Sequence, residues 1–436
     1  MRKTIVLGTT LLLLQIPLAA HVLLQQRTWG GPDRDGAQGV AVASDGSVYV
    51  TGSTRSFGAG DDDAMLLKYG ANGALVWQRT YGTAPDPSNS GEEAGIDVAV
   101  APDNSGVVVL GNYRDGNIFL AKFSPAGALV WDHTWGGNQE GASALAIAPN
   151  GTIYATGATF GFGAGQADAF LLSFTPDGVL NWQRTWGGTL FDVARGVAVA
   201  TDGNIYIAGD TQFTANSAFL VKFATNGSVV WQREWGLLAK NGVPGDTRGT
   251  GVAAAPAGGA YVSGSSTGAG ADPNLLVARF DATGNFVWQR VGGPGFGDTQ
   301  DIAVGPEGNV HVTGNVLTDG GNSGANAFVW TLLANGRGND ASIWGGADLF
   351  ELEHGTSIAT APGGDVLVAG SAGAPPYTFS RGSKNAKAAS TFLNTIAGTI
   401  TNPGGVVGDS AAVVQIPAGS ETFAGASDAF LLRLQP

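Results

Sequence analysis

The sequence predicts an all-β fold: a seven-bladed β-propeller of four-stranded antiparallel blades, with the ring closed by the N-terminal strand. Three observations predict it, namely an aromatic–Gly step at nearly constant spacing, four strand-like runs in each period, and a composition suited to tight turns. Gly accounts for 70 of the 436 residues, and charged residues for only 13%. Gly at this density is costly in helices, whereas it suits turns between short strands.

The aromatic–Gly step recurs at intervals of 49 to 56 residues, at Trp29, Tyr81, Trp135, Trp186, Trp235, Val291 (a degenerate copy) and Trp344. In the first period the four runs are 39–44, 48–53, 63–69 and 74–81. Asp-Gly and Asn-Gly pairs between them tolerate the positive φ of tight hairpins. Four antiparallel strands repeated at this spacing are typical of propeller blades.

The two ends of the chain complement one another. The run "DAFLLRL" at 428–434 is the seventh copy of the third strand, and no fourth strand follows it. Residues 21–31, "HVLLQQRTWGG", match the end of a fourth run such as "GVLNWQRTWGG" at 178–188. We therefore expect residues 22–29 to be the outer strand of the last blade, which removes exposed sheet edges.

Residues 1–20 have the pattern of an export signal. Arg2 and Lys3 precede an apolar stretch, which ends in Pro17 and the small residues Ala19 and Ala20. An uncleaved anchor is the alternative, because Leu18 lies where a small residue is preferred. We expect a mature chain that begins near His21, is secreted, periplasmic or attached to the cell surface, and has no further membrane span.

Charge and Cys content exclude several partners and chemistries. Removal of Arg2 and Lys3 would take the formal net charge from −13 to −15, which repels nucleic acids and anionic lipids. The chain has no Cys, and hence no disulfide, thiolate metal site or Cys nucleophile. We expect a monomer stabilised by packing alone.

The repeat "WQRTWGG…GVAVATDGNIYIAGDT…AFLVKF…NGSVVW" resembles the bacterial SBBP-type β-propeller repeat, and the resemblance covers nearly all of 21–436. It implies a propeller fold and an exported or cell-surface protein. It implies no catalytic residues, because the family has no shared catalytic motif.

Ten of the eleven Trp residues lie in the fourth runs, often with Arg two residues away, as in Trp77, Arg79 and Tyr81. Residues i, i+2 and i+4 share a face of a strand. The functional interpretation is a platform for stacking sugars, and a quinone cofactor is a further alternative. We favour packing between blades, because the pattern recurs in nearly every blade and a binding site usually breaks symmetry.

An acidic residue precedes each first strand, in the connection from the previous blade: Asp35, Glu93, Glu140, Asp192, Asp246, Asp298 and Glu353. Two interpretations remain open. Each carboxylate could accept hydrogen bonds from its own loop, or together they could form a negative ring at the channel mouth that binds a cation or a basic ligand.

Residues 371–427 form an insertion between the second and third strands of the last blade. It contains Tyr377 and Phe379 and a basic cluster, Arg381, Lys384 and Lys387, and part of it is compatible with a short helix. Antiparallel topology places both ends of this insertion on the face that carries the seven acids. We therefore predict a mobile lid over the channel mouth, with a loose surface loop as the alternative.

The sequence predicts a non-enzymatic binding or scaffold module whose ligand is a protein, a glycan or a small molecule. The alternative is a propeller lyase or hydrolase with its site on the face that carries the insertion. We expect no catalytic residues, no metal and no cofactor, with calcium at the Asp-rich segments 33–35 and 61–63 as the alternative.

Overall fold

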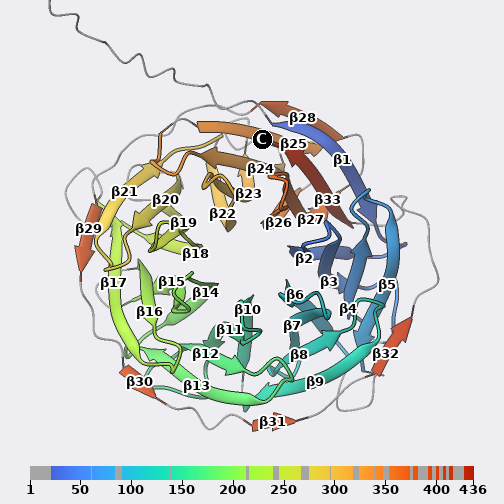
Figure 1. Ribbon diagram of the computed structural model, residues 1–436, viewed down its shortest axis with the longest axis horizontal. Helices are drawn as coiled ribbons and strands as arrows, with labels where there is room; N and C mark the ends of the chain where they lie inside the picture. The colour runs from blue at the N-terminus through green and yellow to red at the C-terminus, as the bar shows by residue number, and fades with distance from the viewer. Residues whose placement is uncertain are drawn as a thin grey trace, which may run out of the picture.

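The computed structural model shows seven β-sheets arranged as blades around a central axis (Figure 1). It describes residues 21–436 except for 60, 84–90, 138, 213–215, 239–244, 267–273, 295, 318–323, 338, 347–352, 374–376, 382–390, 395–398, 402–405, 409–411 and 416–426. The seven-bladed propeller with four-stranded antiparallel blades, predicted from the repeat, is confirmed.

Each blade has four strands, and in the first six blades their order from the axis outwards is their order in the chain. The first strands are β2 (Asp35–Val42), β6 (Glu93–Val100), β10 (Glu140–Ile147), β14 (Asp192–Val199), β18 (Thr247–Ala254), β22 (Phe296–Val304) and β26 (His354–Thr360). The second strands are β3 (Val48–Thr54), β7 (Val107–Tyr113), β11 (Ile153–Thr159), β15 (Ile205–Thr211), β19 (Ala260–Ser266), β23 (Val310–Leu317) and β27 (Val366–Ala372). The third strands are β4 (Asp63–Tyr69), β8 (Ile118–Phe123), β12 (Asp168–Phe174), β16 (Ser217–Phe223), β20 (Asn274–Phe280), β24 (Ala325–Leu332) and β33 (Asp428–Gln435). The outer strands are β5 (Leu75–Gly82), β9 (Leu129–Gly136), β13 (Leu180–Gly187), β17 (Val229–Leu237), β21 (Phe286–Val291), β25 (Asn339–Gly346) and β1 (Val22–Trp29).

The N-terminal strand closes the ring. β1 pairs antiparallel with β33, from Val22 opposite Gln435 to Trp29 opposite Ala429, in the sheet ordered β1-β33-β27-β26. The seventh blade therefore takes three strands from the C-terminal part of the chain and its outer strand from the N-terminal part. The predicted closure is confirmed.

The outer strands join neighbouring blades through a repeated side-chain pattern. The indole N–H of Trp29 donates to Gln78 Oε1 of the next blade at 2.6 Å, and Trp135 and Trp186 donate in the same way to the Gln residues of their next blades. The Arg79 guanidinium lies 5.3 Å from the Trp77 ring and donates to Gly127 O of the next blade. This confirms that the aromatic–Arg pattern packs blades together.

A β-bulge interrupts each first strand where it meets an invariant Gly of the second strand. In the fourth blade, Arg195 is the extra residue, so that Ala194 faces Gly209 and Gly196 faces Ala208. The bulge brings a backbone carbonyl of the first strand so close that a Cβ on Gly209 would lie 1.9 Å from Val193 O. The Gly in every copy of the "VYVTG" run is therefore required by backbone approach rather than by a turn.

The insertion surrounds the blades as a belt of five short strands: β28 (Tyr377–Arg381), β29 (Thr391–Asn394), β30 (Thr399–Thr401), β31 (Val406–Gly408) and β32 (Ala412–Gln415). Each belt strand pairs antiparallel with an outer strand, in the order β25, β17, β13, β9 and β5, and the five lie on the rim (Figure 1). The belt thus passes from the sixth blade to the first, against the order of the blades.

The prediction of a lid over the channel mouth is therefore wrong for these strands. The predicted short helix is also wrong for residues 391–394 and 399–401, which form strands. The insertion does leave from β27 and return at β33 on the predicted face. However, the outer strands offer unpaired backbone N–H and C=O groups on the rim, and short strands from a long insertion satisfy them.

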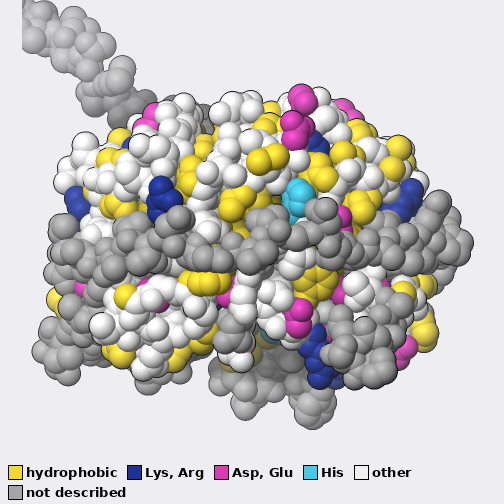
Figure 2. Space-filling model, turned by 90° about the horizontal axis from the view of Figure 1, so that it is seen from below, with side chains coloured by type: hydrophobic (Ala, Val, Ile, Leu, Met, Phe, Trp, Pro, Cys, Tyr) yellow, Lys and Arg dark blue, Asp and Glu magenta, His cyan; other side chains and the backbone are white. Residues whose placement is uncertain are grey.

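From the side, the described part of the rim shows hydrophobic side chains between scattered Lys, Arg, Asp and Glu side chains (Figure 2). No helix among the described residues is long and apolar enough to cross a membrane.

Candidate functional site in the central channel

Most of the seven predicted acids serve the loops in which they lie. Asp35, Glu93, Glu140, Asp192 and Glu353 are at most 5% exposed. Asp192 Oδ2 accepts the N–H of Gly188 at 2.7 Å, and its Oδ1 accepts the Thr211 hydroxyl at 2.5 Å. Asp35, Glu93 and Glu140 likewise accept a backbone N–H from the preceding connection and a hydroxyl group. For these four acids the structure agrees with the local capping interpretation rather than with a charged ring.

The remaining two acids are exposed. Asp246 accepts a hydrogen bond from Asn216 Nδ2 at 3.0 Å, and Asp298 lines the mouth of the channel. A continuous ring of seven carboxylates at the mouth is therefore wrong, because five of its members are buried.

Three of the five predicted insertion residues belong to a strand on the rim. Tyr377, Phe379 and Arg381 belong to β28, where their backbones pair with Gly346, Trp344 and Ser342 of the outer strand β25. Lys384 and Lys387 lie outside the described residues. The structure thus does not bring β28 and the acids together.

The bulges of the seven first strands shape the channel. The extra residues Gln38, Ile96, Ser143, Arg195, Thr250, Gln300 and Thr356 all line a cavity of about 300 Å³ at the mouth. Six of them also border a deeper cavity of about 220 Å³. A bulge turns its extra side chain out of the ladder, and here seven bulges turn such side chains towards the axis.

Immediately after the bulges, a second ring contains two carboxylates among small residues. Its members, in blade order, are Gly39, Asp97, Ala144, Gly196, Gly251, Asp301 and Ser357. Asp97, Asp301 and Ser357 line the deeper cavity. The other members are Gly, Ala or Ser, so the two carboxylates are the only ionisable side chains of this ring.

Backbone donors fix both carboxylates. Asp97 Oδ1 accepts the N–H of Val98 and its Oδ2 accepts the N–H of Leu145 in the next blade, both at 2.8 Å. Asp301 Oδ1 accepts the N–H of Ile302 at 2.7 Å. Its Oδ2 accepts the N–H of Ile358 and the Ser357 hydroxyl in the next blade, both at 2.9 Å. Each Asp thus links two blades and has a fixed position.

The protein environment opposes ionisation of both carboxylates. Burial and the negative charge of Asp301 raise the pKa of Asp97 to about 7, and the hydrogen bonds from Leu145 and Val98 only partly offset this. Burial also raises the pKa of Asp301. A cation that entered the channel would stabilise the ionised forms.

Arg195 is the basic member of the bulge ring. Its guanidinium is held by Asp210 of the neighbouring strand, with Nη2–Oδ2 at 2.7 Å. This pairing satisfies Asp210 and Arg195 together, so Arg195 does not neutralise Asp97 or Asp301.

Sequence reasoning missed Asp97 and Asp301, although a signal was present. The residue before the "VAV"-type run is Gly, Ala or Ser in five blades and Asp in two. The acids of the preceding connections, which sequence spacing does reveal, are mostly loop caps. The register of a bulge decides which residue faces the axis, and spacing alone does not reveal it.

Two of the four His residues, His21 and His311, contact the same hydroxyl group. His311 replaces the Tyr of the second strand, and its Nδ1 lies 2.8 Å from Thr331 Oγ1. His21 Nε2 contacts the same hydroxyl at 2.8 Å, and His21 Nδ1 lies 3.1 Å from Ser342 Oγ. Among the described residues no group of three or more His, Asp or Glu side chains is arranged to hold a metal.

Burial and the neighbouring His21 lower the pKa of His311 to about 3. The unfolded chain takes up this proton below about pH 6.5, whereas the folded chain does not, so the free energy of unfolding falls as pH falls from 6.5 towards 3. We expect His311→Gln to reduce this loss by up to about 1.4 kcal/mol per pH unit. Urea unfolding at pH 7, 5.5 and 4.5 measures it, and parallel pH profiles for both proteins would contradict the assignment.

No protein-family model and no curated protein matches the sequence. Among solved structures, a protein of unknown function from Dyadobacter fermentans is 15% identical, with 87% of this chain and all of that chain covered and a TM-score of 0.44. Raptor from Chaetomium thermophilum is 9% identical over 83% of this chain and 29% of its own, with a TM-score of 0.48. A periplasmic gluconolactonase from Pseudomonas aeruginosa is 17% identical over 64% of this chain and 95% of its own, with a TM-score of 0.35.

Proposed function

We propose that this protein is an exported, non-enzymatic binding propeller that takes a small cationic ligand into its central channel. The observation that carries the proposal is the pair Asp97 and Asp301, two carboxylates fixed by backbone N–H groups at a level of the channel otherwise made of small residues. Export is supported by the residues of the 1–20 segment and by the resemblance to the SBBP-type repeat.

The chemistry of the wall defines the ligand class. Hydroxyl and amide side chains surround the mouth together with Ile96, Arg195 and Arg248, and the two carboxylates Asp97 and Asp301 line the deeper cavity. Amino groups separated by a short chain could contact both carboxylates, while the bulge residues would bind the rest of the ligand by hydrogen bonds. A cavity of about 220 Å³ accommodates a molecule of the size of a short aliphatic diamine.

Putrescine is a suitable probe, with 1,4-butanediol as its uncharged counterpart of equal length. We expect saturable binding of putrescine alone, with an affinity that rises between pH 6 and pH 8, because Asp97 loses its proton near pH 7 and the charge attracts the cation. Calorimetry at pH 6, 7 and 8 measures this.

Asp97→Asn and Asp301→Asn each retain one oxygen acceptor and remove one charge, so each should weaken putrescine binding about tenfold. Asp61→Asn is the matched control, because Asp61 is exposed. An absence of putrescine binding, or equal affinities for the Asp97→Asn and Asp61→Asn variants, would overturn the proposal.

A propeller hydrolase or lyase is the second candidate, and the pKa of Asp97 near 7 favours it because general acid–base catalysis needs such a group. The two functions are distinguishable. Turnover of a cationic ester or glycoside that the Asp97→Asn substitution abolishes, while the variant still binds the substrate, would establish the enzyme.

A further inference from the structure

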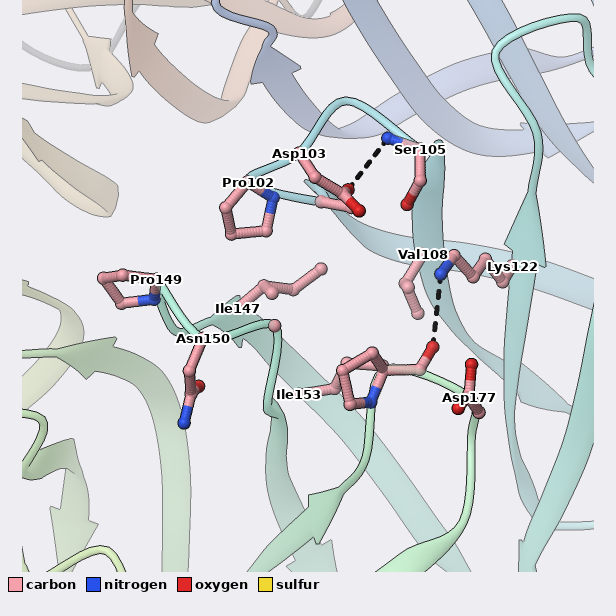
Figure 3. Close-up of a pocket in the computed structure, with 13 residues that line it drawn as sticks. Pro102, Asp103, Ser105, Val108, Lys122, Ile147, Pro149, Asn150, Ile153 and Asp177 are labelled. Carbon is pink, nitrogen blue, oxygen red and sulfur yellow. Dashed lines mark hydrogen bonds between the residues drawn. The ribbon is translucent and has the colours of Figure 1, made fainter.

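A pocket of about 390 Å³ opens between the second and third blades, on the face opposite the channel mouth just described. Its wall includes Val108 and Lys122 of the second blade and Ile147, Ile153 and Pro176 of the third. Figure 3 shows Val108 and Lys122 facing the Ile and Pro side chains of the next blade across this pocket.

The pocket lies where other blades place an aromatic ring. Position 108 is the second residue of its strand, and the equivalent residue is Tyr in four other blades: Tyr49, Tyr154, Tyr206 and Tyr261. Val108 pairs across the ladder with Lys122, as Tyr49 pairs with Lys68 and Tyr206 with Lys222. Val108 is the smallest residue at this position, and the missing ring leaves space beside it.

The equivalent rings show how such an aromatic group is held. Lys68 Nζ lies 5.2 Å from the centre of the Tyr49 ring, and Lys222 Nζ lies 5.3 Å from that of Tyr206. The Tyr261 hydroxyl donates to Ala334 O, in the third-to-fourth-strand turn of the next blade, at 3.2 Å. In the second blade the equivalent cation is Lys122 and the equivalent carbonyl belongs to Pro176, and Lys122 Nζ already lies 3.2 Å from that oxygen.

The neighbouring Trp131 lacks two contacts that its equivalents make. Trp77, Trp182, Trp231 and Trp288 each contact a Tyr ring at 5.8 to 6.0 Å, and Trp131 has no such ring beside it. Trp131 stacks on His133 at 5.2 Å, in the place where the other four indoles contact an Arg. Trp77 Nε1 donates to Pro125 O of the next blade, but Trp131 Nε1 is buried and has no hydrogen-bond partner among the described residues. The pocket therefore retains the cation, and Trp131 packs against the same core cluster as Val108, while the Tyr ring that both contact elsewhere is absent.

We propose that this pocket binds a p-hydroxyphenyl group from a ligand, which occupies the position that Tyr side chains fill in the other blades. The ring lies between Val108 and the Ile residues of the third blade with the Lys122 ammonium over its face, and the hydroxyl donates to Pro176 O. Apolar contact supplies the affinity, while the cation and the carbonyl select a phenol over an aliphatic group.

The first experiment measures binding of p-cresol to the full protein by calorimetry and by chemical-shift changes. We expect one site per chain, and Val108→Tyr should weaken binding at least tenfold and raise the melting temperature, because its own ring fills the pocket. An absence of saturable binding to the parent protein, or equal affinity for the Val108→Tyr variant, would overturn the proposal.

Two further variants test the geometry. Lys122→Met should weaken p-cresol binding about two- to fivefold, the expected effect of an exposed cation–π contact, whereas Lys122→Arg should preserve it. Tyr49→Val should open a matching pocket beside Lys68 and produce a second site if that variant folds. Equal affinities for the Met and Arg variants would show that the cation plays no part and would remove the claimed selectivity.

The same group reaches the pocket either in a free phenol or in a Tyr side chain of a peptide. N-acetyltyrosine amide distinguishes them. Binding tighter than that of p-cresol indicates a peptide source, because the backbone amides then add contacts with the rim residues Asp103, Asn150 and Asp177. Binding of p-cresol alone indicates a free phenol.

Discussion

Deletion of residues 21–29 is expected to lower the melting temperature by about 10 °C or more, or to abolish cooperative unfolding. β1 completes the seventh blade and also holds both neighbouring blades. Gln26 accepts the Trp344 indole N–H of the sixth blade at 3.0 Å, and Trp29 and Arg27 donate to Gln78 and Gly73 of the first. Burial of Trp29, which is 3% exposed, contributes about 5 kcal/mol as an upper bound.

Differential scanning calorimetry of chains that begin at residue 21 and at residue 30 measures the effect. Single substitutions show whether the lost contacts of β1, rather than the shorter chain, lower the melting temperature. Trp29→Ala should reproduce much of the fall in melting temperature. Val22→Ala, at a side chain 54% exposed, should leave the melting temperature nearly unchanged. Equal melting temperatures for the two chains would refute closure by β1.

Gly209→Ala is expected to destabilise the protein by at least about 3 kcal/mol, although it adds a single methyl group. The new Cβ would lie 1.9 Å from Val193 O, and neither atom can move without breaking the pairing of β14 with β15. The same approach of a first-strand carbonyl occurs at Gly52, Gly157, Gly264, Gly314 and Gly370, at 1.8 to 2.1 Å.

Gly141→Ala is the matched control, because a Cβ there meets no atom within 4 Å. We expect it to change the free energy of unfolding by no more than about 0.5 kcal/mol, or to stabilise the protein slightly through the unfolded chain. Urea unfolding of both variants decides the matter, and similar losses for the two would contradict the steric explanation.

The sequence repeat predicts most of the fold. Hairpin turns and strand order follow from residues close in sequence, because Asp-Gly turns and alternating runs act locally. Closure pairs distant residues, but a count of the runs shows that the last blade needs an outer strand. The belt could not be predicted in this way. Residues 391–394 form a strand because the edge of β17, some 160 residues earlier, offers them unpaired backbone groups.

The candidate sites depend on hydrogen bonds, on the register of the bulges and on side-chain packing, and the spacing of the repeat does not specify these. The sequence shows the acids of the loops between blades. It does not show that hydroxyl groups of the second strands bind them, as Thr211 binds Asp192. Asp97 reaches the axis only because Ile96 bulges before it. The space beside Val108 depends on how the equivalent Tyr rings pack against a cation, and the sequence does not show this contact.

The belt also has a consequence for how the molecule assembles. All of its partner strands precede it in the chain, so it can bind only to blades that already present their outer strands. It then leads back to the seventh blade, where β33 meets β1 across a separation of about 400 residues. Such distant pairings make closure of the ring a slow step, since the loop entropy is lost before the contacts form. Until the ring closes, the edges of β1 and β33 can pair with strands of other chains. The belt holds the C-terminal part of the chain against the blades, and so keeps β33 near β1.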